Sequence, residues 1–172
     1  MLLTEFDANR QAIINPEALH EPLEGFPKIA VSCFSRLTFQ RMLEMFPHEL
    51  IYETSMANVA IPIYKLVIDD NELAIFNAPV GASACVGILE DIFALGADKL
   101  VLFGTCGVLD EDIKETSIII PSHALRDEGT SFHYVEASDE IAVNVGVLDR
   151  FRSYLNERQI SHKEGKVWTT DG

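Results

Sequence analysis

The chain has 172 residues, a hydrophobic content of 48% and a formal net charge of −14. This length fits one domain with a sizeable core, and the composition is ordinary for a soluble globular protein. The acidic balance argues against binding to a nucleic-acid backbone, which requires clustered Lys and Arg, although local basic residues can still hold an anionic substrate.

Cysteine usage and the absence of long apolar runs bear on the cellular compartment. Cys33, Cys85 and Cys106 are widely spaced and odd in number, which predicts neither a disulfide framework nor a metal site. No apolar run approaches the roughly 18 residues that cross a bilayer, and the N-terminus lacks the pattern of a signal peptide. We therefore expect a cytoplasmic protein that has no bound metal and associates with neither membrane nor nucleic acid.

The first half of the chain alternates between strand and helix patterns after an arm (residues 1–27) that is punctuated by prolines and expected to pack on the domain. Phe39, Met42, Leu43 and Phe46 recur at helical spacing before Pro47. The expected elements are a strand at 28–33, a helix at 36–46, strands at 61–68 and 72–79 joined by a hairpin turn, and a helix at 83–95 ending at Gly96.

The second half continues the alternation, which predicts a layered α/β domain with a largely parallel sheet. The expected elements are a strand at 99–103, a strand at 116–121 buried on both faces, one long helix at 139–158, and a strand beginning at 166–169. Because no helix follows to cover the last strand, we expect the 172 residues to form one incomplete domain.

The most distinctive local pattern is an apolar strand, 99–103, that runs directly into Gly104-Thr105-Cys106-Gly107. Glycines just past a strand let backbone N–H groups approach a ligand closely, and the threonine adds a hydroxyl. This arrangement suits a small anion or a sugar oxygen at the carboxyl end of a sheet. Two further distinctive segments follow, Ser122–Tyr134 and Lys166–Gly172.

In this order the three segments resemble the nucleoside phosphorylase superfamily, particularly its uridine-phosphorylase-like bacterial branch. The resemblance is carried by residues 104–107, 126–134 and 168–171. It implies a three-layer α/β/α fold with a mixed, largely parallel central sheet, missing its C-terminal part. It also implies cleavage of a nucleoside's N-glycosidic bond with inorganic phosphate as co-substrate and no cofactor, in a homodimer or homohexamer.

The resemblance also implies site residues. Arg36, Gly104, Thr105 and Gly107 match positions that contact phosphate and ribose, whereas Trp168 and Thr169 fall near the base. The catalytic acid is expected beyond Gly172, so we expect the 172-residue chain alone to be inactive. Each match has a plainer structural alternative: a strand-ending turn for Thr105, a helix terminus for Arg36 and a core position for Trp168. Cys106 is expected to be a small buried hydrophobe.

Two departures from the family pattern leave the reaction open. Ser32-Cys33-Phe34-Ser35-Arg36 stands where relatives usually carry Gly-Asp-Pro-x-Arg, and Leu102 stands where many have an arginine. Fewer donors for phosphate favour a nucleosidase that uses water, and a catalytically silent ligand-binding protein is a third possibility. The sequence does not choose among uridine, other pyrimidine nucleosides and purine nucleosides.

Overall fold

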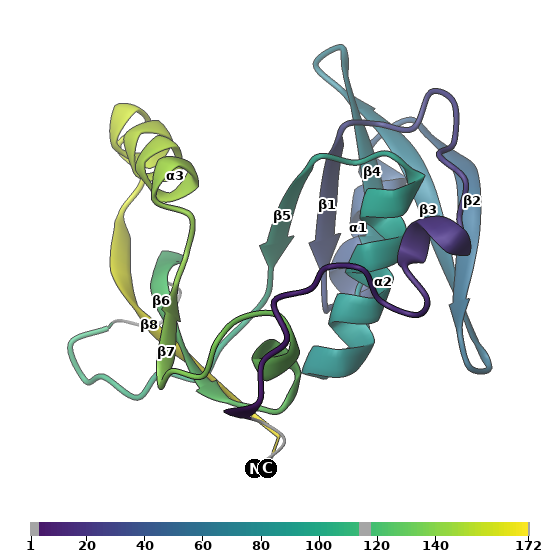
Figure 1. Cartoon of the computed structure of the whole chain (residues 1–172). Helices are drawn as coiled ribbons and strands as arrows, with labels where there is room; N and C mark the ends of the chain where they lie inside the picture. The colour runs from purple at the N-terminus through teal and green to yellow at the C-terminus, as the bar shows by residue number, and fades with distance from the viewer. Residues whose placement is uncertain (1–3, 114–117, 172) are drawn as a thin grey trace. The chain divides into compact units, whose positions relative to one another are not determined.

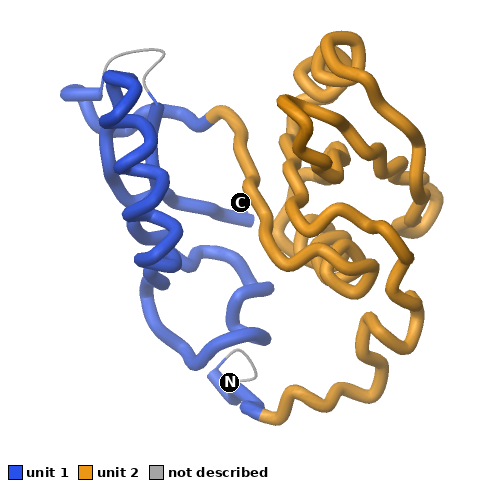
Figure 2. Tube along the Cα trace, turned by 90° about the horizontal axis from the view of Figure 1, so that it is seen from above, with its two compact units in different colours: residues 1–8, 106–172 blue, residues 9–105 orange. Residues whose placement is uncertain are grey.

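The computed structural model (Figure 1) describes residues 4–113 and 118–171. It divides into two compact units, which Figure 2 colours separately: unit 2 comprises residues 9–105, and unit 1 comprises residues 1–8 and 106–172. Each unit has its own sheet. The two are described in turn.

Unit 2 is built on a five-stranded sheet with the order β2-β3-β4-β1-β5. β1 lies between β4 and β5 and is parallel to both, whereas β2, β3 and β4 form an antiparallel meander. The sheet is therefore mixed, as predicted. The strands are β1 (Ile29–Cys33), β2 (His48–Met56), β3 (Val59–Ile68), β4 (Asn71–Asn77) and β5 (Lys99–Phe103).

Two helices cover opposite faces of this sheet, α1 (Arg36–Met45) and α2 (Ala82–Leu95). Successive strand residues point to opposite faces, and the two cores follow this alternation along β4. Ala74 and Phe76 pack in the cluster that contains α2, while Ile75 packs in the cluster that contains α1. Unit 2 thus has the predicted three layers, with a helix on each side of the sheet.

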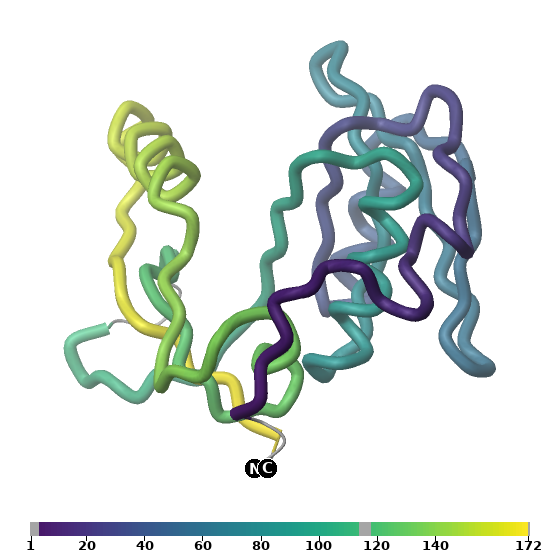
Figure 3. Tube along the Cα trace, viewed as in Figure 1, coloured from purple at the N-terminus to yellow at the C-terminus, as the bar shows by residue number. Residues whose placement is uncertain are grey.

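The second half of the arm (residues 1–27) packs on the rest of unit 2, as predicted. Figure 3 traces its path past α2. A short 3₁₀ helix, η2 (Pro16–Ala18), precedes this contact. The Leu23 amide donates to the Leu95 carbonyl at 3.0 Å, and Phe26 is buried in the α2 cluster. Phe26 therefore anchors the end of this proline-punctuated segment in the core of unit 2.

The strand β2 was not predicted, whereas the turn between β3 and β4 and the end of α2 were. Among the residues of β2 only Thr54 is fully buried, so the strand carries little apolar alternation and depends on its pairing with β3. The predicted hairpin turn is confirmed: Asp69 and Asp70 both have positive φ, at 48° and 62°. Gly96, at φ 130°, ends α2 as expected.

Unit 1 holds a three-stranded sheet with the order β7-β6-β8. β6 (Ile118–Asp127) lies between β7 (Glu140–Ala142), which is antiparallel to it, and β8 (His162–Thr170), which is parallel. A 3₁₀ helix η3 (Thr130–His133) follows β6, and α3 (Val145–Glu157) joins β7 to β8. No helix in the described part of the chain is long and apolar enough to cross a membrane.

Two predictions in this unit were wrong. The helix expected over 139–158 begins later, at Val145, because residues 140–142 pair with β6. Asn144 then caps α3, its Oδ1 accepting the Val147 amide at 3.1 Å. The strand at 116–121 is not buried on both faces: Ile119, which points to the face opposite Ile118 and Ile120, is only partly buried, and Ile118 is 40% exposed. The first two residues of that predicted strand, 116 and 117, lie outside the described residues.

Candidate functional site

Three parallel strands of unit 2 end at one edge of its sheet. Cys33, the last residue of β1, is paired with Asn77 at the end of β4 and with Phe103 at the end of β5. The segments that follow these strands therefore start side by side. They lead into the N-terminus of α1, the N-terminus of α2 and the Gly104-Thr105 turn. In open α/β sheets ligands bind outside the carboxyl ends of the strands.

Both helices present their N-termini at this edge without an acidic side chain in the first turn. Ser35 caps α1, its Oγ accepting the Thr38 amide at 3.2 Å, while the N-cap residue of α2 is Gly81, which has φ 105° and offers no side-chain cap. Helix N-termini carry a partial positive charge and unpaired N–H groups. The edge is thus electrostatically suited to an anion.

Arg36 adds a full positive charge at the same edge. It is the first residue of α1, is exposed, and makes no ion pair or hydrogen bond with any of the described residues. A cation at a helix N-terminus is unfavourable to the helix dipole by about 0.3–1 kcal/mol. A bound anion would relieve this repulsion, which makes Arg36 a candidate ligand residue rather than a helix-stabilising one.

The edge itself is held rigidly by hydrogen bonds between the strand ends. The Asn77 side-chain amide donates to the Cys33 carbonyl at 2.7 Å, and the Ala78 backbone amide donates to the same carbonyl at 3.0 Å. The buried Ser32 hydroxyl donates to the Phe76 carbonyl at 2.9 Å. Burial raises the pKa of the Cys33 thiol, which keeps this cysteine protonated and makes it a poor nucleophile.

The two glycines of the turn after β5, Gly104 and Gly107, have different surroundings. A Cβ atom on Gly104 would lie 2.9 Å from Cδ2 of Phe34, so a larger residue at this position would have to displace the Phe34 ring, which is 37% exposed. A Cβ atom on Gly107, which belongs to unit 1, would meet no atom within 4 Å. Thr105 is exposed, so its hydroxyl is accessible at the edge of unit 2. Cys106 is also exposed, which makes the prediction of a buried Cys106 wrong.

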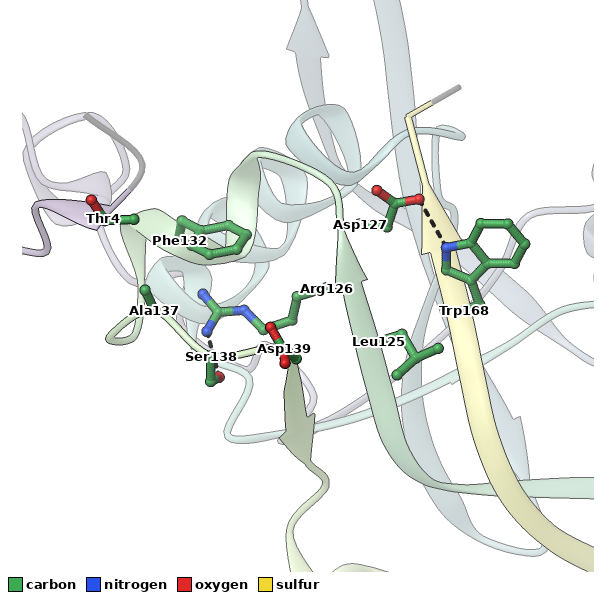
Figure 4. Close-up of a pocket in the computed structure, with 9 residues that line it drawn as sticks. All are labelled: Thr4, Leu125, Arg126, Asp127, Phe132, Ala137, Ser138, Asp139 and Trp168. Carbon is green, nitrogen blue, oxygen red and sulfur yellow. Dashed lines mark hydrogen bonds between the residues drawn. The ribbon is translucent and has the colours of Figure 1, made fainter. Parts of the chain in front are cut away.

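Unit 1 contains an open pocket of about 510 Å³ (Figure 4). Trp168 lines it and is 54% exposed, and its indole Nε1 donates to Oδ2 of Asp127 at 3.0 Å. Thr169, the next residue of β8, is directed to the opposite face of the strand and does not line the pocket. The lining residues are Thr4, Leu125, Arg126, Asp127, Phe132, Ala137, Ser138, Asp139 and Trp168.

The structure groups the predicted residues in two sets. Arg36, Gly104 and Thr105 share the carboxyl edge of unit 2, and Trp168 lines the pocket of unit 1. Sequence reasoning missed Ser35 and Gly81 at the edge, although a serine before a helix and a glycine between a strand and a helix are recognised signals. It also missed Asp127 as a partner of Trp168, since only the pairing of β6 with β8 brings the two together.

Metal binding finds no support in the described residues, since they contain no group of three or more His, Cys, Asp or Glu side chains able to hold an ion. The donors at the carboxyl edge of unit 2 are instead N–H groups, hydroxyls and a guanidinium. Such donors bind oxygen-rich anions and sugars.

A family model described as the phosphorylase superfamily matches residues 28–172. The chain belongs to this superfamily. The match spans both units and includes every one of the predicted site residues. The predicted membership of the nucleoside phosphorylase superfamily is thereby confirmed.

Two curated relatives within the phosphorylase superfamily carry different substrate names. A guanosine phosphorylase from Halorubrum lacusprofundi is 28% identical over 74 residues, which cover 41% of this chain and 31% of the relative. A uridine phosphorylase from Treponema pallidum is 29% identical over 91 residues, covering 53% of this chain and 35% of the relative. The matched segments thus span about a third of each relative.

Solved structures of the phosphorylase superfamily share the fold at lower identity. A uridine phosphorylase from Vibrio fischeri superimposes with a TM-score of 0.75 at 18% identity, covering 94% of this chain and 66% of that one. A purine nucleoside phosphorylase from Toxoplasma gondii, in complex with immucillin-H, gives 0.73 at 16% identity, with coverages of 85% and 58%. These similarities confirm the predicted phosphorylase fold.

Proposed function

We propose that this protein is a nucleoside phosphorylase that cleaves the N-glycosidic bond of a uridine-like nucleoside with inorganic phosphate. The observation that carries the proposal is the shared carboxyl edge of β4, β1 and β5. Two helix N-termini, the Arg36 guanidinium and the Thr105 hydroxyl all follow strands that end there. This edge combines positive charge for a phosphate with a neutral donor for a sugar.

The proposed chemistry assigns a role to each group. A phosphate oxygen attacks C1′ of the sugar as the bond to the base breaks, and the base leaves with the bonding electron pair and takes up a proton. The products are the free base and ribose 1-phosphate. Because charge develops on phosphate, sugar and base together, preorganised donors lower the barrier. Arg36 and the backbone of Gly104 would hold phosphate, and Thr105 would contact phosphate and ribose.

The base is proposed to lie against Trp168, whose exposed indole provides a flat stacking surface. Thr169 was predicted for the same role, but it occupies the opposite face of β8 from Trp168. We therefore retain Trp168 as the stacking residue and assign Thr169 no more than a contact made by its backbone.

A nucleosidase is the second candidate, and a specific feature of unit 2 favours it. Arg36 is the single arginine in the segments that directly follow the three strands, and Leu102, near the end of β5, is a neutral side chain. A site with fewer cationic donors binds phosphate less tightly. Water could then replace phosphate as the nucleophile, and the products would be base and free ribose.

A panel of nucleosides, assayed with the full-length protein in the presence and absence of phosphate, tests both candidates, with the released base and the sugar product measured separately. The phosphorylase proposal expects turnover that requires phosphate and yields ribose 1-phosphate, with uridine preferred over inosine and guanosine. Equal rates in phosphate-free buffer, with ribose as product, would establish the nucleosidase instead. If the full-length protein binds nucleosides but cleaves none of them, it is a catalytically silent ligand-binding protein.

We also propose that the protein is cytoplasmic and forms a homodimer or homohexamer. The support for association is an exposed edge strand: Val101, Leu102 and Phe103 of β5 are each about two-fifths exposed in the described structure. Apolar residues on a free strand edge favour pairing with another surface. Sedimentation analysis over a range of concentrations measures the state, and a monomer at all concentrations would refute this part of the proposal.

A further inference from the structure

Arg126 is a buried cation that the function proposed above does not use. It lies near the end of β6, is 8% exposed, and lines the pocket that contains Trp168. We propose that Arg126 is a positioning residue, which holds the segment 131–138 as a preformed wall of this pocket. That the ligand entering this pocket is a nucleobase rests on the proposed function.

The guanidinium of Arg126 is bound by acceptors spread along this segment. Nε donates to Oγ of Ser131 at 2.9 Å, and Nη1 donates to the Glu136 carbonyl at 2.6 Å and to Oγ of Ser138 at 2.9 Å. Nη2 donates to the Val135 carbonyl at 3.3 Å. One planar group therefore ties together acceptors that lie up to seven positions apart in the chain.

Phe132 is held by the same guanidinium, whose central carbon lies 4.1 Å from the centroid of the phenyl ring. Figure 4 shows the guanidinium between this ring and Ser138. Stacking of an Arg guanidinium on an aromatic ring is a favourable cation–π contact that strengthens as solvent is excluded. The orientation of the Phe132 ring in the pocket thus depends on Arg126.

The two residues after Arg126 extend the same arrangement. Asp127 accepts the indole N–H of Trp168, which fixes the rotation of that ring. The Glu128 carboxylate accepts the Ser131 amide at 3.0 Å and also the Ser131 hydroxyl. Consecutive residues of one strand end therefore hold the pocket's two aromatic side chains, Phe132 and Trp168, before a ligand arrives.

A direct role for Arg126 in holding an anion is less consistent with these contacts. Four of its five N–H groups already donate to protein acceptors. Three of the four acceptors belong to the segment 135–138. Loss of these hydrogen bonds would release the segment from Arg126 and would not remove a contact with a ligand. The geometry requires the planar fork of arginine, which lysine cannot reproduce despite its equal charge.

The experiment uses Trp168, the only tryptophan of the chain, as its probe. Intrinsic fluorescence is titrated with uracil and uridine for the wild type, Arg126→Lys and Arg126→Gln. We expect both substitutions to weaken binding about tenfold. Without Arg126 the segment 131–138 becomes ordered only when the ligand binds, and this ordering reduces the free energy of binding. Arg158→Lys is the matched control, since Arg158 stacks on Tyr154 at 3.8 Å outside the pocket and should leave binding unchanged.

Amide hydrogen exchange provides a readout that does not depend on a ligand. Arg126→Lys should raise exchange in residues 129–138 while β8 amides stay protected. Wild-type affinity in Arg126→Lys would overturn the proposal, because charge alone would then suffice. Weakened binding with unchanged exchange would also overturn it, because Arg126 would then contact the ligand itself.

A milder variant keeps the test usable if substitution of Arg126 prevents folding. Ser138→Ala removes one exposed acceptor of the guanidinium and is expected to weaken binding about two- to fivefold with a small rise in exchange. Unchanged binding and exchange in this variant would count against the proposal. If the wild-type fluorescence responds to no base, the base-binding part of the proposed function fails. The exchange comparison still decides whether Arg126 holds the segment.

Discussion

Gly104 and Phe34 approach each other so closely that a Cβ atom at position 104 would lie 2.9 Å from Cδ2 of the Phe34 ring. The two residues follow β5 and β1, which are adjacent parallel strands. Their contact packs the Gly104-Thr105 turn against the segment that leads to Arg36. The glycine that the sequence associates with ligand approach therefore has a packing role in the protein itself.

This contact predicts different outcomes for two glycine-to-alanine substitutions. Gly104→Ala should lower the free energy of unfolding by about 1–2 kcal/mol, because the new methyl group displaces the Phe34 ring. Gly107→Ala should change it by less than about 0.5 kcal/mol, because the space around Gly107 is open. Urea denaturation measures both values. A Phe34→Ala background should abolish the cost of Gly104→Ala, and persistence of that cost would contradict the steric explanation.

We expect Arg36 to bind phosphate through its position at the N-terminus of α1. Phosphate is expected to raise the thermal midpoint of the wild type, and Arg36→Ala should reduce this increase and raise the KM for phosphate about tenfold, as expected when a charged hydrogen bond is lost. Arg41→Ala is the control, because Arg41 is also exposed on α1 but lies more than one turn from its N-terminus. Equal effects of the two substitutions would mean that general charge, and not the position of Arg36, attracts phosphate.

Asp91 connects the arm, β2 and α2 through its carboxylate. Its Oδ2 accepts the hydroxyl of Thr54, which is 5% exposed, at 2.7 Å, and its Oδ1 lies 3.0 Å from Nε2 of His20. Asp91→Ala should destabilise the protein by about 2–3 kcal/mol, since it leaves a buried hydroxyl and an imidazole without their partner. Asp98→Ala, on the exposed turn after α2, should cost less than about 0.5 kcal/mol. Urea denaturation of both variants provides the comparison.

The three cysteines should differ in reactivity. Cys106 is exposed, whereas Cys33 and Cys85 are buried and burial raises the pKa of both thiols. A thiol reagent at pH 8 should therefore modify one cysteine rapidly and the other two only after unfolding. Rapid modification of two or three cysteines in the native protein, measured by mass, would contradict this burial pattern.

The same pKa shifts imply a loss of stability at alkaline pH. A raised pKa means that the folded state holds the thiol proton more tightly than the unfolded state does. The resulting stabilisation is complete below about pH 8.5, the ordinary cysteine pKa, and is lost as the pH rises through the raised value. Cys85→Ala should reduce the decline in denaturation midpoint between pH 8 and pH 10. An unchanged decline of the denaturation midpoint in this variant would mean that ionisation of other groups causes it.

Strong local signals explain which elements could be predicted. α1 and α2 carry apolar residues at helical spacing and end at Pro47 and Gly96, so both were placed within one or two residues. β2 carries no such signal, because it is an edge strand whose order comes from pairing with β3. The helix predicted over 139–158 failed at its start because residues 140–142 pair with β6, a partner more than ten residues away in sequence.

By itself, the sequence determined the α/β alternation and the identity of the groups that can bind an anion, since these depend on residue type and short-range spacing. The superfamily followed from the resemblance of residues 104–107, 126–134 and 168–171 to a known family. Only the tertiary structure decided that Arg36 and Thr105 share one edge of a sheet, that Gly104 packs against Phe34, and that Asp127 holds Trp168. Each of these relationships depends on strand register. The apolar pattern of a strand selects the face that is buried, but the strands concerned here pair with distant segments, and the pattern of one strand does not identify its partner.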